Sequence, residues 1–334
     1  MNRFIIFLPV YNGEKYIEAA IESIVKQMYL NWMLVIIDNA SIDSTAKIIK
    51  KYLVKYQNIN CLHNEITLSI EKNWSRILDY LLVNDTLAKE YKYMTIIGHD
   101  DILYPEFLQN INESIISDTN AKLYTTNYNI IDSRGVVKRR AKAVPCVCKL
   151  EDYFVLRYTR KIETYGTGFV FKVVDFKSIG GYPILPKLLY SDDLFIIRII
   201  RNSYIRKSEN IGFCYRLHSL SVSGKNPYIG FNDLLTSFLI YWDIIKYEFI
   251  SEINCNSNII NAFKYYVEYI FLNFEFFFKL IKKDKIIIKK LQKVRQELAY
   301  ENGYLISFSI MIRCLNIMRS MRFILLFFYK KGGR

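Results

Sequence analysis

The stretch Phe4–Val10 (FIIFLPV), followed by Tyr11-Asn12-Gly13-Glu14, decides the fold of this chain. Its apolar, β-branched run has the length of a strand buried on both faces, and it ends in turn-forming residues. Apolar residues then recur at helical spacing, beginning with Ile17, Ile21 and Ile24. A strand followed by a helix is the repeating unit of an α/β protein with parallel strands.

Two further runs repeat this pattern, and acidic residues follow each of them. Met33–Ile37 (MLVII) ends on Asp38, and Tyr93–Ile97 (YMTII) ends on Gly98-His99-Asp100-Asp101. In an open α/β sheet, ligands bind beyond the carboxyl ends of the strands, so Asp38 and Asp100 are predicted to face one crevice. Carboxylates in a crevice of a basic protein favour a divalent cation and a phosphate-bearing ligand. A helix cap is the alternative interpretation of Asp100-Asp101.

Three motifs in register resemble the family 2 glycosyltransferases of the GT-A fold. They are Leu8–Asn12 (LPVYN), Ile37–Thr45 (IDNASIDST) and His99–Leu103 (HDDIL), and the resemblance covers roughly residues 3–225. It implies a mostly parallel sheet flanked by helices, and a nucleoside diphosphate sugar as donor, in most members a UDP-sugar. It also implies a divalent metal, Mg²⁺ or Mn²⁺, and inversion at the anomeric carbon.

The resemblance also assigns roles to individual positions. Pro9, Tyr11 and Glu14 lie where the first loop of the family cradles the nucleotide. Asp38 is expected to accept a hydrogen bond from the base. The remaining donor-site positions are Lys72 and Asn73, near the nucleotide or its phosphates, and Asp100, which contacts the nucleotide and is the metal-binding end of the family's DxD element. Gly98 stands at the first acidic position of that element, which is a departure from the family pattern.

A second segment, Tyr190–Phe195 (YSDDLF), leads into a predicted helix. It resembles the acceptor-side segment of the family, in which a Glu-Asp pair opens a helix and the Asp is the catalytic base; Ser191 replaces the Glu here. An inverting transfer needs a base that removes the proton of the attacking hydroxyl, and a carboxylate can serve. Asp192 is the predicted base and Asp193 its rival, while helix capping is the structural alternative for both.

Two more features bear on the predicted site. Thr164–Gly168 and Ile179–Pro183 together hold four glycines, which suit tight turns and close approach of the backbone to a ligand. Tyr215–Ser223 resembles a segment that follows the last core strand in bacterial members. There His218 is expected to contact the metal or diphosphate and Arg216 to bind phosphate. No role is assigned to His63, which ends a strand-like run, or to His99.

The chain divides by composition into a predicted catalytic domain, residues 1–228, and a helical, basic and aromatic region, residues 229–334. The net charge is +14, and residues 302–334 hold six basic residues and no acid. Such helices suit the surface of an anionic membrane. Packing against the catalytic core or a second subunit is the alternative. Six scattered cysteines and the absence of a cleavage site after Arg3 suggest a reduced protein on the cytoplasmic face of the membrane.

These patterns predict a glycosyltransferase that adds a sugar to a glycan acceptor, lipid-linked as in O-antigen or capsule synthesis. A sugar nucleotidyltransferase, which shares the nucleotide-binding half, is an alternative enzyme. A nucleic-acid-binding protein is an alternative of another class, suggested only by the charge. No recognised nucleic-acid motif accompanies the basic residues, so nucleic acid is not an expected partner.

Overall fold

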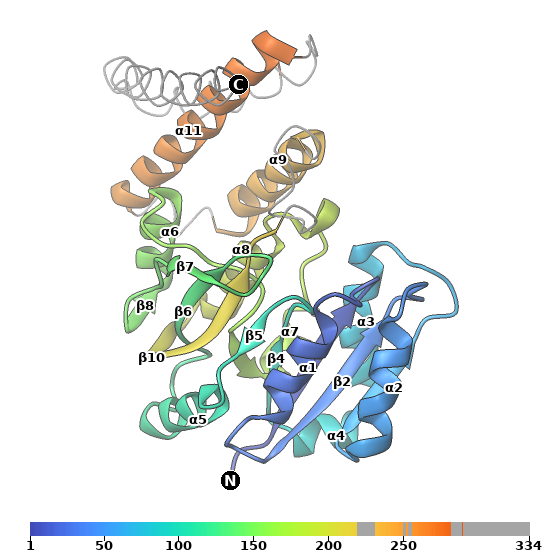
Figure 1. Ribbon diagram of the computed structural model, residues 1–334. Coiled ribbons are helices and arrows are strands. Elements are labelled where there is room, and N and C mark those ends of the chain that lie inside the picture. The colour runs from blue at the N-terminus through green and yellow to red at the C-terminus, as the bar shows by residue number, and fades with distance from the viewer. Residues whose placement is uncertain (219–230, 250–251, 253–255, 282–288, 290–334) are drawn as a thin grey trace. The chain divides into compact units, whose positions relative to one another are not determined.

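The computed structural model describes residues 1–218, 231–249, 252, 256–281 and 289. The chain forms two compact units: residues 1–153 with 161–250, and residues 154–160 with 251–334. The first unit holds the sheet and the predicted site (Figure 1). The boundary predicted at residue 228 lies outside the described residues.

The first half of the sheet is parallel and alternates with helices, as the apolar runs predict. Its strands are β1 (Phe4–Val10), β2 (Trp32–Asp38), β3 (Ile59–His63) and β4 (Tyr93–Ile96). Its helices are α1 (Ile17–Val25), α2 (Thr45–Lys55), α3 (Ile70–Val83) and α4 (Asp85–Glu90). The strand order β3-β2-β1-β4 brings Val10 beside Asp38 and Asp38 beside His63 in the ladders. The carboxyl ends of β1, β2 and β3 therefore meet at one edge.

The second half adds short antiparallel pairings around one long parallel pair. Its strands are β5 (Ile102–Leu103), β6 (Leu123–Ile131), β7 (Val137–Arg140), β8 (Val147–Lys149), β9 (Val170–Lys172) and β10 (Tyr204–Arg216). Its helices are α5 (Phe107–Ser117), α6 (Leu150–Tyr158), α7 (Val173–Ser178), a 3-10 turn (Pro186–Leu188), α8 (Ser191–Ile200) and α9 (Phe231–Glu248). β9 joins the halves, because it pairs with β4 on one side and β6 on the other. Most paired residues of the sheet lie in parallel ladders, so the predicted mostly parallel sheet is confirmed.

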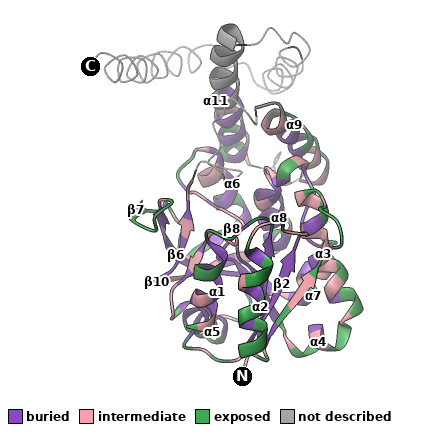
Figure 2. Ribbon diagram, turned by 45° about the vertical axis from the view of Figure 1, so that its right-hand side comes forward, coloured by how far each residue is buried: buried purple, intermediate pink, exposed green. Residues whose placement is uncertain are grey.

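Alternation along the strands builds the core. Every residue of β1 and β2 is buried (Figure 2). Phe4, Ile6 and Leu8, two residues apart, belong to one hydrophobic cluster together with Ile17 and Ile21 of α1. Each such side chain contributes about 1.5–3 kcal/mol when it is removed from water. The core therefore holds the strand ends in place, and the polar loops beyond them are free to carry a site.

The second unit contains the end of α6 and the helix α11 (Ser257–Ile281). Tyr158 stacks on Phe263, with ring centroids 4.2 Å apart, and Arg160 lies 4.0 Å from the centroid of the Tyr269 ring. Among the helices that the structure describes, none is both long enough and apolar enough to cross a membrane. The membrane prediction rests on the basic, aromatic region 229–334, and residues 290–334 of that region lie outside the described residues.

Candidate active site

The first and second predicted motifs are joined by hydrogen bonds between their loops. The backbone N–H groups of Asn12, Gly13 and Glu14 donate to Ser41 Oγ (3.0 Å), Thr45 Oγ1 (2.8 Å) and Asp43 Oδ2 (3.1 Å). In return, Glu14 Oε2 accepts from the Ser44 N–H (3.0 Å). Glu14, assigned to the nucleotide, therefore also fixes the loop beside it. Pro9 is buried at the end of β1, and the Tyr11 ring is 44% exposed.

Asp38 ends β2, and its carboxylate is almost fully enclosed, being 1% exposed. Its Oδ1 accepts from the N–H (3.1 Å) and the hydroxyl (2.5 Å) of Ser41. Its Oδ2 lies 3.0 Å from Nδ1 of His63, the neighbouring residue in the β2–β3 ladder. The structure thus places Asp38 at the predicted edge, enclosed by Ser41 and by His63, whose side chain is 57% exposed.

Lys72 and Asn73 lie in the first turns of α3 and have different surroundings. Lys72 is exposed, and its N–H donates to the capping Ser69 hydroxyl. Asn73 is buried and accepts a hydrogen bond from Asn64 (2.9 Å), whose amide nitrogen also donates to Asn39 (2.8 Å). Asn73 is therefore tied to the segment after Asp38 through buried amides, whereas Lys72 is exposed to solvent.

Asp100 and His218 are brought together across 118 residues of sequence. Asp100 Oδ2 and His218 Nε2 are 2.8 Å apart, and both side chains are largely buried. Arg216 Nε donates to the Asp100 carbonyl oxygen at 2.6 Å. The Tyr16 ring lies beside both basic residues, 5.0 Å from the His218 ring and 4.7 Å from the Arg216 guanidinium. The two residues predicted at the metal and the one predicted at phosphate therefore form one cluster.

Asp101, the next residue, is a buried carboxylate that joins the loop after β4 to distant parts of the chain. It is 1% exposed and accepts from the Arg216 N–H (2.8 Å) and from Thr167 Oγ1 (2.5 Å). Burial raises the pKa of the Asp101 carboxyl well above its usual range, and the charge of Asp100 adds to the rise. Because β5 rather than a helix follows this pair, the helix-cap interpretation of Asp100-Asp101 is wrong.

Gly98, the departure from the DxD pattern, is closely packed. A Cβ there would lie 2.9 Å from Asp100 Oδ1 and 2.9 Å from Asp101 Oδ2, so a longer acidic side chain would displace both carboxylates. His99 packs against the first loop, since a Cβ on Gly13 would lie 2.7 Å from its ring. Burial lowers the pKa of His99, which favours the neutral ring.

The Asp100–His218 pair fits a divalent cation in its donor chemistry. A carboxylate oxygen and an imidazole nitrogen are ligands that Mn²⁺ accepts, and Mg²⁺ commonly binds through one or two carboxylates plus phosphate oxygens and water. Within the described part of the chain, no three histidine, cysteine, aspartate or glutamate side chains converge as a ready-made metal site. A cation here would share its coordination between the protein pair and its ligand.

Asp192 and Asp193 lie in the first turn of α8, after Tyr190 at the cap position, and they differ in environment. Asp193 is 3% exposed and accepts from the hydroxyls of Tyr153 (2.6 Å) and Thr164 (3.3 Å). Asp192 is half-buried and accepts from the Tyr182 hydroxyl. Burial raises the pKa of Tyr182 well above its usual range, and the charge of Asp192 raises it further, so this hydroxyl stays a donor.

The loop Thr164–Gly168 links the two acidic pairs. Thr164 contacts Asp193, Thr167 contacts Asp101, and a Cβ on Gly166 would lie 3.2 Å from Asp192 Oδ1. Gly168 has φ +89° and presses on the Phe213 ring, where no side chain fits. The glycines thus let the loop backbone lie against side chains of the site. The sequence indicated only that these glycines suit tight turns and close approach of the backbone.

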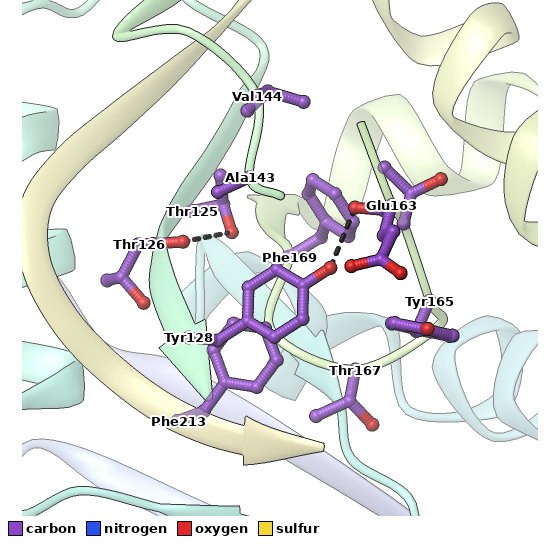
Figure 3. Close-up of a pocket in the computed structure, with 11 residues that line it drawn as sticks. Thr125, Thr126, Tyr128, Ala143, Val144, Glu163, Tyr165, Thr167, Phe169 and Phe213 are labelled. Carbon is purple, nitrogen blue, oxygen red and sulfur yellow. Dashed lines mark hydrogen bonds between the residues drawn. The ribbon is translucent and has the colours of Figure 1, made fainter. Parts of the chain in front are cut away.

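A small cavity lies on the other side of this loop (Figure 3). Its lining includes Tyr128, Glu163, Thr164, Thr167 and Phe213, and neither Asp100 nor Asp192 contributes to it. Tyr128 stacks on Phe213 at 4.5 Å and donates to the Glu163 carbonyl oxygen at 2.7 Å. Thr164 and Thr167 line this cavity and also contact Asp193 and Asp101, so the cavity adjoins the candidate site.

Several residues of the site were missed by sequence reasoning. His63 and Tyr182 contact the predicted residues Asp38 and Asp192, but the sequence analysis assigned no role to either of them. Thr167 was visible only as part of a glycine-rich stretch. The position of His63 at a strand end, level with Asp38, was the one available signal.

Comparisons with known proteins bear on the family and the fold of this chain. The model of the glycosyl transferase family 2 matches residues 5–179. An Escherichia coli relative, the UDP-Glc:alpha-D-GlcNAc-diphosphoundecaprenol beta-1,3-glucosyltransferase WfgD, is 23% identical over 72% of this chain and 86% of its own. Alignments with the first curated relatives span only 32–48% of those proteins.

Solved structures share the fold. S. aureus TarS 1-349 in complex with UDP-GlcNAc has a TM-score of 0.58 at 16% identity, covering 90% of this chain and 92% of its own. The mannosyltransferase PcManGT from Pyrobaculum calidifontis, in complex with GDP-Man and Mn²⁺, has a TM-score of 0.51 at 14% identity. The match covers 96% of this chain and 80% of PcManGT. The predicted GT-A fold is therefore confirmed.

Proposed function

Because the chain belongs to the glycosyl transferase family 2, we propose that it transfers a sugar from a nucleoside diphosphate sugar to a glycan hydroxyl, with inversion. One observation carries this: the short loop Thr164–Gly168 touches both the Asp100-Asp101 pair and the Asp192-Asp193 pair. A cluster suited to a diphosphate and a carboxylate suited to an acceptor thus lie on either side of one loop.

The donor is proposed to lie along the carboxyl ends of β1, β2 and β4. The exposed Tyr11 ring offers a stacking surface for the base, and the exposed Lys72 offers a charge for the phosphates. Asp100 and His218 would hold Mg²⁺ or Mn²⁺, which when bound neutralises charge on the leaving diphosphate. Arg216, held on the Asp100 carbonyl and above Tyr16, places a permanent positive charge beside the same cluster.

Asp192 is the proposed base, and its surroundings support it over Asp193. Asp193 is enclosed by Tyr153 and Thr164, so an acceptor could reach it only by displacing both. Asp192 would take the proton of the acceptor hydroxyl while that oxygen bonds to the anomeric carbon. The bond from that carbon to the diphosphate oxygen breaks in the same step, and the nucleoside diphosphate leaves with the electron pair. Tyr182 would hold the Asp192 carboxylate in position during this step.

The acceptor is proposed to be a lipid-linked glycan of the O-antigen or capsule type, with the protein peripheral to an anionic membrane on its cytoplasmic face. Support comes from WfgD, whose name specifies a diphosphoundecaprenol-linked sugar, and from the basic C-terminal composition. The sugar nucleotidyltransferase alternative differs in product, since it would release pyrophosphate rather than a nucleoside diphosphate.

The test is a panel of nucleotide sugars assayed for nucleoside diphosphate release in the presence of Mn²⁺ or Mg²⁺. Asp192→Asn keeps the size of the side chain but removes proton acceptance, so turnover should fall by about 10²–10⁴-fold. Donor binding should be unchanged, because Asp192 acts on the acceptor. Asp193→Asn is the matched control; if it is the inactive variant while Asp192→Asn turns over normally, the assignment of the base is wrong.

A further inference from the structure

Neighbouring residues of the protein already contact both oxygens of the Asp38 carboxylate. Two donors from Ser41 fill the positions around Oδ1, at 3.1 Å from the backbone nitrogen and 2.5 Å from the hydroxyl. Oδ2 faces His63 Nδ1 at 3.0 Å, and the side chain is 1% exposed. A nucleobase could bond directly to Asp38 only by displacing these groups, because the Asp38 side chain is almost fully enclosed.

His63 stands where the base would otherwise meet Asp38. It ends β3 level with Asp38, so both lie at the carboxyl edge of the parallel strands. Its side chain is 57% exposed, and Nδ1 is held by Asp38. For Nε2 the described residues supply no hydrogen-bond partner, so this nitrogen is available to a ligand. The pair therefore presents an imidazole edge, oriented by a buried carboxylate, at the nucleotide end of the site.

The carboxylate also decides which ring nitrogen carries the proton. A carboxylate only accepts hydrogen bonds, so Nδ1 must donate, and the neutral ring then has a lone pair on Nε2. We propose that His63, positioned by Asp38, reads the nucleobase through Nε2 and selects a pyrimidine whose ring nitrogen N3 carries a proton. Uracil and thymine have this N3–H, whereas N3 of cytosine is an acceptor and would face a second lone pair. The inference rests on the proposed nucleotide-sugar function.

The test measures binding of UDP, dTDP and CDP by calorimetry at about pH 8. UDP and CDP are matched in size and charge and differ in the pattern of donors and acceptors on the ring. The wild-type protein should bind UDP and dTDP about tenfold more tightly than CDP, the equivalent of one hydrogen bond. His63→Phe keeps a planar ring without the acceptor, so UDP and CDP should bind almost equally. Asn60→Ala, exposed on the same strand, is the control and should keep the preference.

Asp38→Asn supplies a sharper version of the test. The Ser41 N–H can only donate, so the amide oxygen must keep the Oδ1 place and the amide nitrogen must face His63. That nitrogen donates to Nδ1, which moves the ring proton to Nε2. The variant should then bind CDP more tightly than the wild-type protein does, and UDP less tightly.

The outcomes separate this inference from the proposed function. If the wild-type protein binds UDP and His63→Phe leaves the UDP-to-CDP ratio unchanged, His63 does not read the base, although the glycosyltransferase proposal stands. If Asp38→Asn weakens all three ligands equally, the oriented-imidazole mechanism is wrong. If the wild-type protein binds none of the three, the base-reading inference fails, and the panel of nucleotide sugars decides the proposed function separately.

Discussion

At the scale of single residues, the site contrasts enclosed carboxylates with reachable ones. Asp38, Asp101 and Asp193 are each at most 3% exposed and accept hydrogen bonds from neighbouring residues. Asp100 and Asp192 have partners too, but they keep some solvent exposure. The enclosed acids hold the loops, and the two acids that keep some exposure are the ones for which we propose roles in the reaction.

Tyr182→Phe tests the contact that positions the proposed base. A carboxylate that loses a hydrogen-bond donor binds its proton more tightly, so the acid limb of the kcat profile should move to higher pH. We expect kcat at neutral pH to fall by about tenfold, the equivalent of one hydrogen bond. Stability measured by thermal unfolding is the control. An unchanged pH profile would show that Tyr182 does not act through Asp192.

Cys61 reports on the charge of Asp38. Burial raises the pKa of the Cys61 thiol to about 11 from 9.0, and the negative charge of Asp38 contributes to the rise. Only the thiolate reacts, so alkylation at pH 8 should be about 100-fold slower than for an ordinary thiol and should accelerate with pH up to about 11. Asp38→Asn should speed the reaction at pH 8, as followed by mass spectrometry. Equal rates in both proteins would show that Asp38 does not influence the thiol.

At the scale of elements, the loops after β1 and β2 act as one unit. Donors of the first loop bind acceptors of the second, and the reverse holds for Asn12 Oδ1 and Glu14 Oε2. The family motifs in this region are therefore as much a description of how two loops bind each other as of how they bind a ligand. We therefore expect a change in one loop to affect the binding of a ligand to the other.

Thr45→Val tests this interlock. Thr45 is fully buried, and its Oγ1 accepts from the Gly13 N–H at 2.8 Å. Valine has a similar shape but no acceptor, so an unpaired buried N–H should lower the free energy of unfolding by about 1–3 kcal/mol. Thr45→Ser retains the hydroxyl and should lose less. Denaturant unfolding measures both variants, and equal stability of Thr45→Val and the wild-type protein would contradict the interlock.

At the scale of the whole molecule, the C-terminal region combines a packed helix, α11, with a basic stretch, residues 302–334. The described helix α11 packs on the end of α6 within the second unit, where Tyr158 is 1% exposed. Part of the predicted membrane-binding region lies beyond this helix, outside the described part, and includes Arg313, Arg319 and Arg322. Two truncations can therefore separate packing from surface attraction.

Truncation after Tyr300 should weaken sedimentation with anionic liposomes and leave the melting temperature nearly unchanged. Each basic residue near an anionic surface contributes about 1 kcal/mol of attraction, which salt screens. Truncation after Ile250 also removes Phe263 from Tyr158 and should lower the melting temperature. If the chain ending at Tyr300 binds liposomes as fully as the intact protein but loses stability, these residues pack on protein instead.

The sequence by itself determined the fold and brought the residues of the candidate site to one edge of the sheet. Apolar runs such as Phe4–Val10 are long enough for buried strands, and parallel strands direct the residues after them to one edge. Asp38 and Asp100 were found in this way, because strand ends are a local property. Order along the chain also indicated the acidic pair at Asp192.

Only the tertiary structure decided which acidic side chain of each pair is enclosed. Adjacent acids such as Asp192 and Asp193 have nearly identical local sequence, and their exposure depends on distant partners, Tyr182 in one case and Tyr153 in the other. The His63–Asp38 and His218–Asp100 contacts join strand ends and loops 25 and 118 residues apart. Hydrogen-bond partners of this kind depend on strand register and loop closure, which no periodicity in the sequence records.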